Sequence, residues 1–214
     1  MHNNLFPVYL DINGRKSLVV GGGMVARRKI ADLLECGCQV TVISLRADAM
    51  IVDWANEGRI TWLQREFNNE DLQNVFLVFL ATDNHRVNGR IADLCRDKGI
   101  MVNAVDDPVN CSFFVPSVLR RQSLAIAIST SGNSPLFARK LKEELGDVVT
   151  DAYGEFVEML GQQRKLIQER ITDIKERKRV FETLIDSDIL ELLKAGEKEK
   201  ARERMEQCMS CLRD

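Results

Sequence analysis

A glycine-rich segment that directly follows a short apolar run is the feature that most restricts the fold of this chain. The apolar run is Ser17-Leu18-Val19-Val20, and the next residues, Gly21-Gly22-Gly23-Met24-Val25-Ala26, fit the pattern G-x-G-x-x-A. The first glycine of this pattern allows a tight turn, the second lets a phosphate approach the backbone, and Ala26 lets a helix pack closely on the strand. Apolar residues at helical spacing then follow up to Gly37. The segment therefore predicts a strand, a turn and a helix whose N-terminus binds the pyrophosphate of a dinucleotide.

The alternation of strand and helix patterns continues through the first half of the chain. Strand-like apolar runs occupy residues 16–20, 39–43, 60–63, 75–81 and 100–105, and helical patterns occupy residues 25–36, 47–56, 69–72 and 86–97. Continuous apolar strands between helices predict a parallel sheet covered on both faces. Right-handed crossovers favour the strand order 3-2-1-4-5, so we expect a Rossmann-type doubly wound α/β domain. Ligands of such sheets bind beyond the carboxyl ends of the strands, here at residues 21–25, 44–46, 82–83 and 106–107.

The pattern changes after residue 111. Two strands are expected at 113–116 and 124–128, joined at 120–122, and a helix is expected from the N-cap Ser134 to Leu145, closed by Gly146. Residues 147–214 are rich in Glu, Lys, Arg and Leu and predict about three helices, with turns near 186–188 and 195–196. We therefore expect a nucleotide-binding domain (1–112), a small α+β region (113–146) and a helical C-terminal domain (147–214).

The overall charge excludes some classes of partner. The chain has 30 basic and 32 acidic residues, a net charge of -2, which favours neither nucleic acid nor an anionic membrane. No signal peptide is visible, and the longest apolar run, 75–81, is too short to span a membrane. Six cysteines without a secretory signal predict reduced thiols and a cytoplasmic protein. The pair Cys208 and Cys211 lacks further ligands nearby, so we expect a mobile tail there and no metal site.

Two questions of chemistry stay open at the level of the residues. Ser44-Leu45-Arg46 follows the second strand without the acidic residue that often binds the ribose of NAD, and Arg46 suits the 2′-phosphate of NADP, so neither nucleotide is excluded. Asp106 follows the fifth strand. It suits a proton acceptor beside a hydride-transfer site, but Asp106-Asp107-Pro108 also fits a plain solvated turn.

Several further segments carry a resemblance to a known family. They are Leu5-Phe6-Pro7-Val8-Tyr9-Leu10, Val19 to Lys29, Ala81-Thr82-Asp83 with Val87-Asn88, Asn103-Ala104-Val105-Asp106, Ser112 to Ser117 and Ile128 to Pro135. In this order they resemble precorrin-2 dehydrogenases, which include the dehydrogenase–ferrochelatase half of siroheme synthases. The resemblance runs from residue 5 to about residue 146 and more loosely through the helical tail.

The resemblance implies NAD-dependent oxidation of precorrin-2 to sirohydrochlorin by a homodimer that associates through residues 113–146. It implies that Asp106 is the functional aspartate. The cofactor residues that it implies are Met24, Val25, Leu45 and Arg46, which join the candidates from the glycine turn and the sheet rim, Gly21, Gly22, Gly23 and Thr82. Because the substrate carries many carboxylates, the candidates for its contacts are Ser129, Ser134, Arg120 and Arg139. No methyltransferase domain follows, so a full siroheme synthase is not expected, and insertion of ferrous iron stays open.

Two other functions compete with this interpretation. An NAD-binding sensor or scaffold without catalysis needs the glycine turn but no carboxylate at Asp106. An NADP-linked carbonyl reductase is disfavoured because the Tyr-x-x-x-Lys pair of one large group is absent. For the nucleotide site itself, Gly21→Asp is expected to abolish binding and to leave the fold largely intact.

Overall fold

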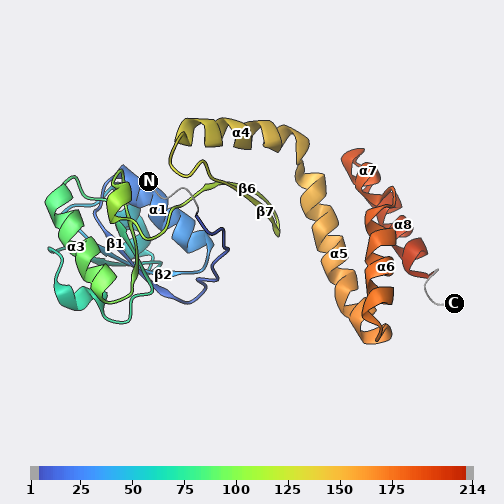
Figure 1. Ribbon diagram of the computed structural model, residues 1–214, viewed down its shortest axis with the longest axis horizontal. Helices are drawn as coiled ribbons and strands as arrows, with labels where there is room; N and C mark the ends of the chain where they lie inside the picture. The colour runs from blue at the N-terminus through green and yellow to red at the C-terminus, as the bar shows by residue number, and fades with distance from the viewer. Residues whose placement is uncertain (1–4, 211–214) are drawn as a thin grey trace. The chain divides into compact units, whose positions relative to one another are not determined.

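The computed structural model describes residues 5–210, and the chain divides into two compact units, residues 1–115 and 116–214 (Figure 1). The first unit contains β1 (Lys16–Val20), α1 (Met24–Glu35), β2 (Gln39–Ile43), α2 (Ala49–Asn56), β3 (Thr61–Leu63), the 3-10 helix η1 (Asn69–Leu72), β4 (Leu77–Leu80), α3 (His85–Asp97), β5 (Met101–Ala104) and the 3-10 helix η2 (Pro108–Asn110). The second contains β6 (Ser117–Arg121), β7 (Leu124–Ile128), α4 (Pro135–Val148), α5 (Asp151–Arg170), α6 (Ile174–Ile185), α7 (Ile189–Lys194) and α8 (Lys198–Ser210).

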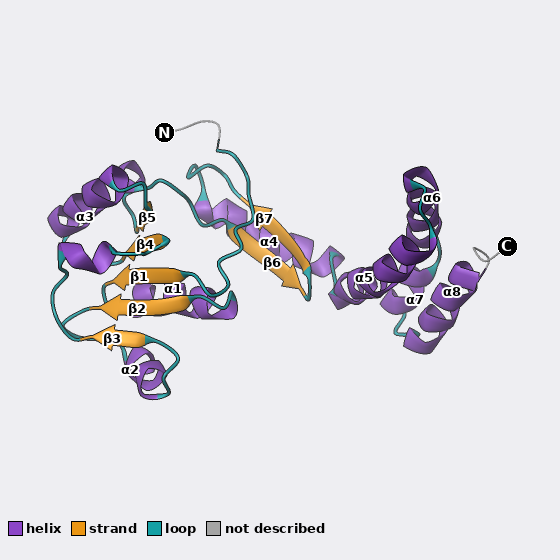
Figure 2. Ribbon diagram, turned by 90° about the horizontal axis from the view of Figure 1, so that it is seen from below, coloured by secondary structure: helices purple, strands orange, loops and turns teal. Residues whose placement is uncertain are grey.

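The first unit is built on one parallel sheet of five strands in the order β3-β2-β1-β4-β5 (Figure 2). This confirms the predicted doubly wound order. Every neighbouring pair is parallel, and the register aligns Val20 of β1 with Ile43 of β2 and Leu80 of β4. The carboxyl ends of these three strands therefore lie at one edge of the sheet, which is where the loops predicted to bind the nucleotide begin.

Alternate side chains of the strands enter two separate cores, one on each face of the sheet. On one face Val19 and Val42 pack with Ile30 of α1 and Ile51 of α2. On the other face Leu18 and Val78 pack with residues of α3 such as Ile91. All of these side chains are buried, so both faces of the sheet are covered, as the continuous apolar strands predict.

Local signals set the helix boundaries in both units. The side chains of Asp48, Asn84 and Ser134 accept hydrogen bonds from backbone N–H groups in the first turns of α2, α3 and α4. Gly37 follows α1 with φ +72°, a left-handed conformation that glycine adopts without strain. These N-caps and this glycine explain why the predicted helices of the first unit begin and end within about two residues of those observed.

The second unit opens with the antiparallel hairpin β6–β7, and here the sequence-based strand was wrong. The strand expected at 113–116 lies at 117–121, and the turn falls at Gln122 and Ser123. Phe113 is instead held by the first unit: its carbonyl accepts from Asn103, and its ring meets that of Phe79 edge-on with centroids 5.4 Å apart. Proline 116, which has no N–H to donate, then precedes the hairpin.

The helix after the hairpin is longer than expected. Gly146 does not close α4, which continues to Val148, and no positive φ occurs at Gly146. The helix is stabilised here by Arg121, whose guanidinium donates to the carbonyls of Gly146 at 3.2 Å and Val149 at 2.9 Å.

Helices α5, α6, α7 and α8 form a core of their own, around Phe156, Leu184, Ile189 and Met205. The sequence predicted about three helices, and the additional break comes at Ile171, which is extended, before Asp173 caps α6. Cys208 packs partly buried on this core from α8, so the expected mobile tail is wrong at this residue; Cys211 lies outside the described residues. Within residues 5–210, none of the helices combines the length and the apolar character needed to span a bilayer.

Candidate nucleotide and proton-transfer site

Gly21 is fixed between the ends of two strands. Its N–H donates to the carbonyl of Ile43 at 2.9 Å, and its φ is +120°. A Cβ at this position would lie 2.3 Å from the carbonyl oxygen of Ala81, a contact that backbone cannot relieve without moving. The expectation that Gly21→Asp spares the fold is therefore wrong, because any side chain here would push β4 away from the turn.

Gly22 is needed for a different reason, which the glycine pattern alone does not reveal. A Cβ on Gly22 would lie 2.1 Å from the carbonyl oxygen of Arg46, and the Gly22 carbonyl accepts the N–H of Asp48 at 2.7 Å. The loop after β2 thus rests directly on the glycine turn. Both glycines shape the rim by letting backbone approach backbone.

Gly23 has open space where its side chain would be, with no atom within 4 Å of an ideal Cβ. It is the N-cap of α1 and offers no side chain to the N–H groups of the first turn, which also contains no acidic residue. These N–H groups and the positive end of the helix dipole are therefore available to an anion. A backbone cradle with free N–H groups fits the pyrophosphate of NAD or NADP, and Met24 and Val25 belong to the same turn.

The loop after β2 is held by two side-chain contacts. Trp62 Nε1 donates to Ser44 Oγ at 3.0 Å and lies 3.2 Å from the Ser44 carbonyl. Arg27 of α1 forms an ion pair with Asp48 at 3.4 Å. Leu45 and Arg46 lie between these two contacts and are exposed, so their side chains are accessible to a ligand. The Ser44 hydroxyl, which accepts from Trp62, keeps its own hydrogen for a further acceptor.

Thr82 follows β4 and is held by a buried asparagine, Asn88, to which the sequence analysis assigned no role. Asn88 is 1% exposed. Its Nδ2 donates to the Thr82 carbonyl at 2.9 Å, and its Oδ1 accepts from the Thr82 hydroxyl at 2.6 Å. A polar residue on the otherwise apolar inner face of an amphipathic helix is the signal that could have found it, because buried amides need partners.

Asp106 and Asp107 follow β5 at the same edge of the sheet. The Asp107 N–H donates to the Ala104 carbonyl at 3.2 Å, and Asp106 inside this turn has φ +58°. Asp107 Oδ2 accepts from Asn110 Nδ2 at 2.7 Å, whereas the exposed Asp106 carboxylate forms no hydrogen bond or ion pair with other described residues. Of the two aspartates, Asp106 is therefore the one free to accept a proton from a ligand.

Burial shifts the pKa of two groups in this unit. Desolvation lowers the pKa of Lys29, whose ammonium lies 5.6 Å from the centre of the Phe79 ring. Desolvation also raises the pKa of the Cys111 thiol beside the Asp106 turn, so this thiol keeps its proton at neutral pH.

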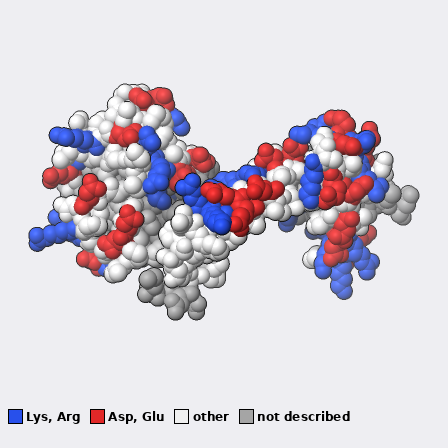
Figure 3. Space-filling model, turned by 90° about the horizontal axis from the view of Figure 1, so that it is seen from above, with Lys and Arg blue, Asp and Glu red and all other residues white. Residues whose placement is uncertain are grey.

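The residues predicted to contact substrate lie in the second unit. Ser129 precedes α4, where its Oγ accepts from the N–H of Ser131, while the Ser134 hydroxyl caps α4. Arg139 is paired with Glu143 at 3.1 Å on the same helix, whereas the exposed guanidinium of Arg120 forms no hydrogen bond or ion pair with the described residues. Figure 3 shows basic and acidic side chains interspersed on the face that it draws. Because its guanidinium is not paired with a carboxylate, Arg120 is more available than Arg139 to an anionic ligand.

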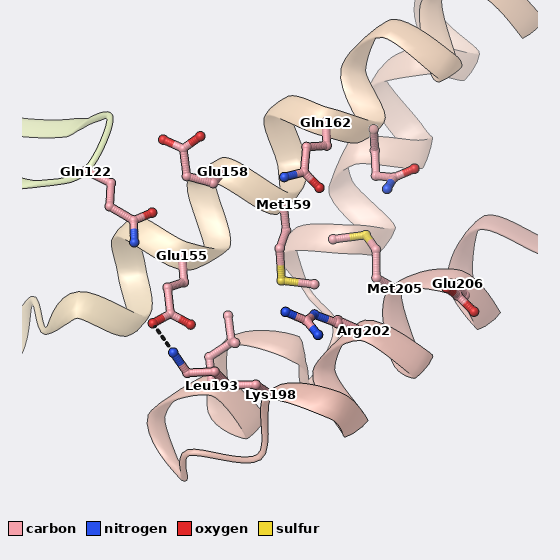
Figure 4. Close-up of a pocket in the computed structure, with 11 residues that line it drawn as sticks. Gln122, Glu155, Glu158, Met159, Gln162, Leu193, Lys198, Arg202, Met205 and Glu206 are labelled. Atoms are coloured by element: carbon pink, nitrogen blue, oxygen red, sulfur yellow. Dashed lines mark hydrogen bonds and ion pairs between the residues drawn. The ribbon is translucent and has the colours of Figure 1, made fainter.

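A cavity of about 380 Å³ in the second unit contains none of the predicted residues (Figure 4). It lies between α5 and the α7–α8 segment, with Met159, Leu193 and Met205 among its lining residues. Its charged groups are largely paired, since Lys198 contacts Glu155 at 2.6 Å and Arg202 contacts Glu199 at 2.7 Å. Neither here nor in the rest of the part of the chain that the structure describes do three His, Cys, Asp or Glu side chains come together as metal ligands.

Family comparisons cover almost the whole chain. A model for NAD(P)-binding domains matches residues 8–117, a model for the central region of sirohaem biosynthesis proteins matches 121–147, and a model for the sirohaem synthase dimerisation region matches 152–209. The last of these falls on α5 to α8, C-terminal to the segment 113–146 that the resemblance assigned to dimerisation.

Individual relatives agree with these models. The siroheme synthase of Mannheimia succiniciproducens is 34% identical over 95% of this chain, and that of Nitrosococcus oceani is 36% identical over 94%. The chain spans only 43% of the length of each of these relatives. The solved structure of SirC, a precorrin-2 dehydrogenase, superposes with a TM-score of 0.77 at 28% identity, covering 95% of this chain and 100% of its own.

The first half of the chain thus carries the NAD(P)-binding domain, and the second half carries the two regions that follow it in sirohaem synthases. The chain belongs to the family of precorrin-2 dehydrogenases and siroheme-synthase N-terminal regions.

Proposed function

We propose that this chain catalyses the NAD-dependent dehydrogenation of precorrin-2 to sirohydrochlorin in siroheme biosynthesis. The observation that carries the proposal is the free Asp106 carboxylate at the same sheet edge as the glycine cradle. The likeness to SirC over its full length supports the choice of substrate. The match to the NAD(P)-binding model alone supports only nucleotide binding, and the carboxylate adds what an enzyme needs and a sensor or scaffold does not.

Different residues at the rim of the sheet bind different parts of the nucleotide. The N–H groups at Gly23, Met24 and Val25 bind the pyrophosphate, and Gly21 and Gly22 keep the surrounding backbone close enough to form the cradle. Leu45 and Arg46 contact the adenosine end, while Thr82, fixed by Asn88, lines the path toward the nicotinamide. The bound nucleotide supplies a hydride acceptor at this edge of the sheet.

Asp106 completes the chemistry. Oxidation of precorrin-2 to sirohydrochlorin removes two electrons and two hydrogens, one as hydride and the other as a proton. The Asp106 carboxylate accepts the proton, and because this residue is exposed it returns the proton to solvent before the next turnover. Asp107 cannot replace it fully, since one of its carboxylate oxygens is already engaged by Asn110.

We expect the protein to use NAD in preference to NADP. Ser44, where an acidic residue often stands, follows β2, and its hydroxyl hydrogen is free to reach a ribose oxygen because Trp62 donates to a lone pair of the same oxygen. Arg46 alone would favour the 2′-phosphate of NADP. Turnover with NADP that equals or exceeds turnover with NAD, at the same concentration, would contradict this choice.

The assembly and the compartment are part of the same proposal. The match of residues 152–209 to a dimerisation region supports a homodimer, and the exposed Leu136 and Phe137 of α4 add apolar surface for an interface. The functional parts of the chain are then the NAD-binding domain (1–112), the small α+β region (113–146) and the helical C-terminal domain (147–214). A cytoplasmic location is supported by the free thiols of the five described cysteines.

An anaerobic assay tests the proposal. Precorrin-2 is incubated with the protein and NAD, and sirohydrochlorin is followed by absorbance; ferrous ion is then added as the second substrate of a chelation step. Formation of sirohydrochlorin that depends on protein and NAD is expected. Tight binding of NAD without any turnover would instead favour the sensor, and loss of free sirohydrochlorin on addition of iron, faster than in protein-free controls, would add the chelatase activity.

A further inference from the structure

The turn that carries Asp106 is conformationally demanding. It spans Ala104 to Asp107, and its third residue, Asp106, has the positive φ that type II turns require and that glycine or asparagine usually supplies. An aspartate is tolerated in this region only at some cost in free energy, and such residues persist where the surroundings hold them. The segment that directly follows η2 contacts this turn.

The Cys111 thiol contacts both ends of the turn. Its Sγ lies 3.2 Å from the Ala104 nitrogen and accepts that N–H. The same sulfur lies 3.2 Å from the Ala104 carbonyl oxygen and 3.3 Å from the Asp107 carbonyl oxygen, to either of which the S–H can donate. A single side chain therefore links the first and the last residue of the turn that presents Asp106.

These contacts belong to a continuous covering of the outer edge of β5. Ser112 next to it accepts the N–H of Val102 on Oγ at 2.8 Å and donates its own N–H to the Val102 carbonyl at 2.8 Å. Asn103 Nδ2 donates to the Phe113 carbonyl at 2.9 Å. Cys111 is the last member of this series and the one that extends from the strand into the turn.

The thiol suits this place because it both accepts and donates. Its burial favours the protonated form, so the S–H donor is kept at neutral pH. An alanine would leave the Ala104 N–H without an acceptor inside the protein, and a buried unpaired N–H costs about 1–3 kcal/mol. The left-handed turn would then lose one of the contacts that oppose its relaxation.

We propose that Cys111 is a positioning residue for dehydrogenation, which holds Asp106 in its left-handed turn by linking Ala104 to Asp107. This inference rests on the proposed function of Asp106. Cys111 itself touches neither substrate nor nucleotide; it acts through the geometry of the turn. Its removal should therefore lower kcat while binding of NAD at the glycine cradle is unaffected.

Steady-state kinetics of the full-length protein test the inference. Cys111→Ala is expected to lower kcat by about 10- to 100-fold, the loss that small misplacements of reacting groups cause, with KM for NAD unchanged within about twofold. Cys111→Ser keeps a donor and an acceptor and should restore most of kcat. In an Asp106→Asn background, Cys111→Ala should cause no further loss, since the group that it positions is already absent.

Cys95→Ala is the matched control, because Cys95 is a buried thiol of α3 in the same core whose Sγ forms no hydrogen bond with the described residues, and it should keep parental kcat. If Cys111→Ala fails to fold by circular dichroism, Cys111→Val takes its place, since it fills the space without a hydrogen bond. Parental kcat in Cys111→Ala beside an impaired Asp106→Asn would overturn this inference alone. Equal impairment of Cys111→Ser and Cys111→Ala, or a further loss in the Asp106→Asn background, would also overturn it. Parental kcat in Asp106→Asn would remove the proposed role of Asp106 and this inference together.

Discussion

Asn110 Nδ2 donates to Asp107 Oδ2 at 2.7 Å, and this hydrogen bond separates two adjacent aspartates into two roles. Asp107 is tied to the 3-10 helix that follows it, whereas Asp106 stands free at the rim. We therefore expect Asp106→Asn to lower the rate of sirohydrochlorin formation by about 10²–10⁴-fold, because an amide cannot accept the proton. The rate is measured anaerobically with saturating NAD.

Asp107→Asn is the control for this prediction. It removes the same charge from the neighbouring position, yet the amide oxygen can still accept from Asn110, so the loss should be much smaller. A larger loss in Asp107→Asn than in Asp106→Asn would contradict the prediction and would indicate that Asp107 is the proton acceptor.

Gly23→Asp should weaken binding of the nucleotide without disturbing the fold. Its side chain meets open space, but it places a negative charge at the helix N-terminus where the pyrophosphate binds. The expected loss is about 1–2 kcal/mol, or about 5- to 30-fold in Kd for NAD by calorimetry. Gly161→Asp, at a helical glycine with equally open space, should leave Kd unchanged.

Arg120 and Arg121 are neighbours with opposite expectations. Arg121→Ala should lower the free energy of unfolding by about 1–3 kcal/mol, because its guanidinium holds the carbonyls of Gly146 and Val149. The exposed Arg120→Ala should change it by less than about 0.5 kcal/mol but should raise KM for precorrin-2. Urea unfolding followed by circular dichroism, together with steady-state kinetics, separates the two; an unchanged KM in Arg120→Ala would remove it from the substrate site.

Cys95 should make the protein less stable at alkaline pH. Burial raises the pKa of its thiol from 9.0 to about 11, so between these values the folded chain keeps a proton that the unfolded chain has lost. The free energy of unfolding should then fall by about 1.4 kcal/mol per pH unit from pH 9 to 11 on account of this group. Cys95→Ala should show a shallower decline than the parent over that range, and parallel declines would contradict the prediction.

The fold of the first unit could be predicted because its signals are local. Apolar runs give the strands, and the handedness of crossovers then leaves one strand order, which the structure confirms. The error at 113–116 arose because Phe113 looks like a strand residue and yet packs against Phe79, far away in sequence. The helix end predicted at Gly146 was wrong for a similar reason. Arg121 of β6 donates to the Gly146 carbonyl, and α4 continues to Val148.

The candidate site divides in the same way. The glycine turn and Asp106 follow strands directly, so their place on the rim could be deduced from order along the chain. Asn88 and Cys111 act through contacts with residues six and seven positions away, across a turn whose shape no sequence pattern specifies. Even the need for Gly22 depends on the path of a loop more than twenty residues later.

The covered edge of β5 bears on how this protein behaves at high concentration. An uncovered edge strand presents N–H and C=O groups that can pair with another chain and seed aggregation. Here Cys111 and Ser112 occupy those groups at Val102 and Ala104 of β5, and β3 at the opposite edge has only three residues. Loss of this short segment from the sheet, with every helix still in place, would be enough to expose a template for intermolecular strand pairing.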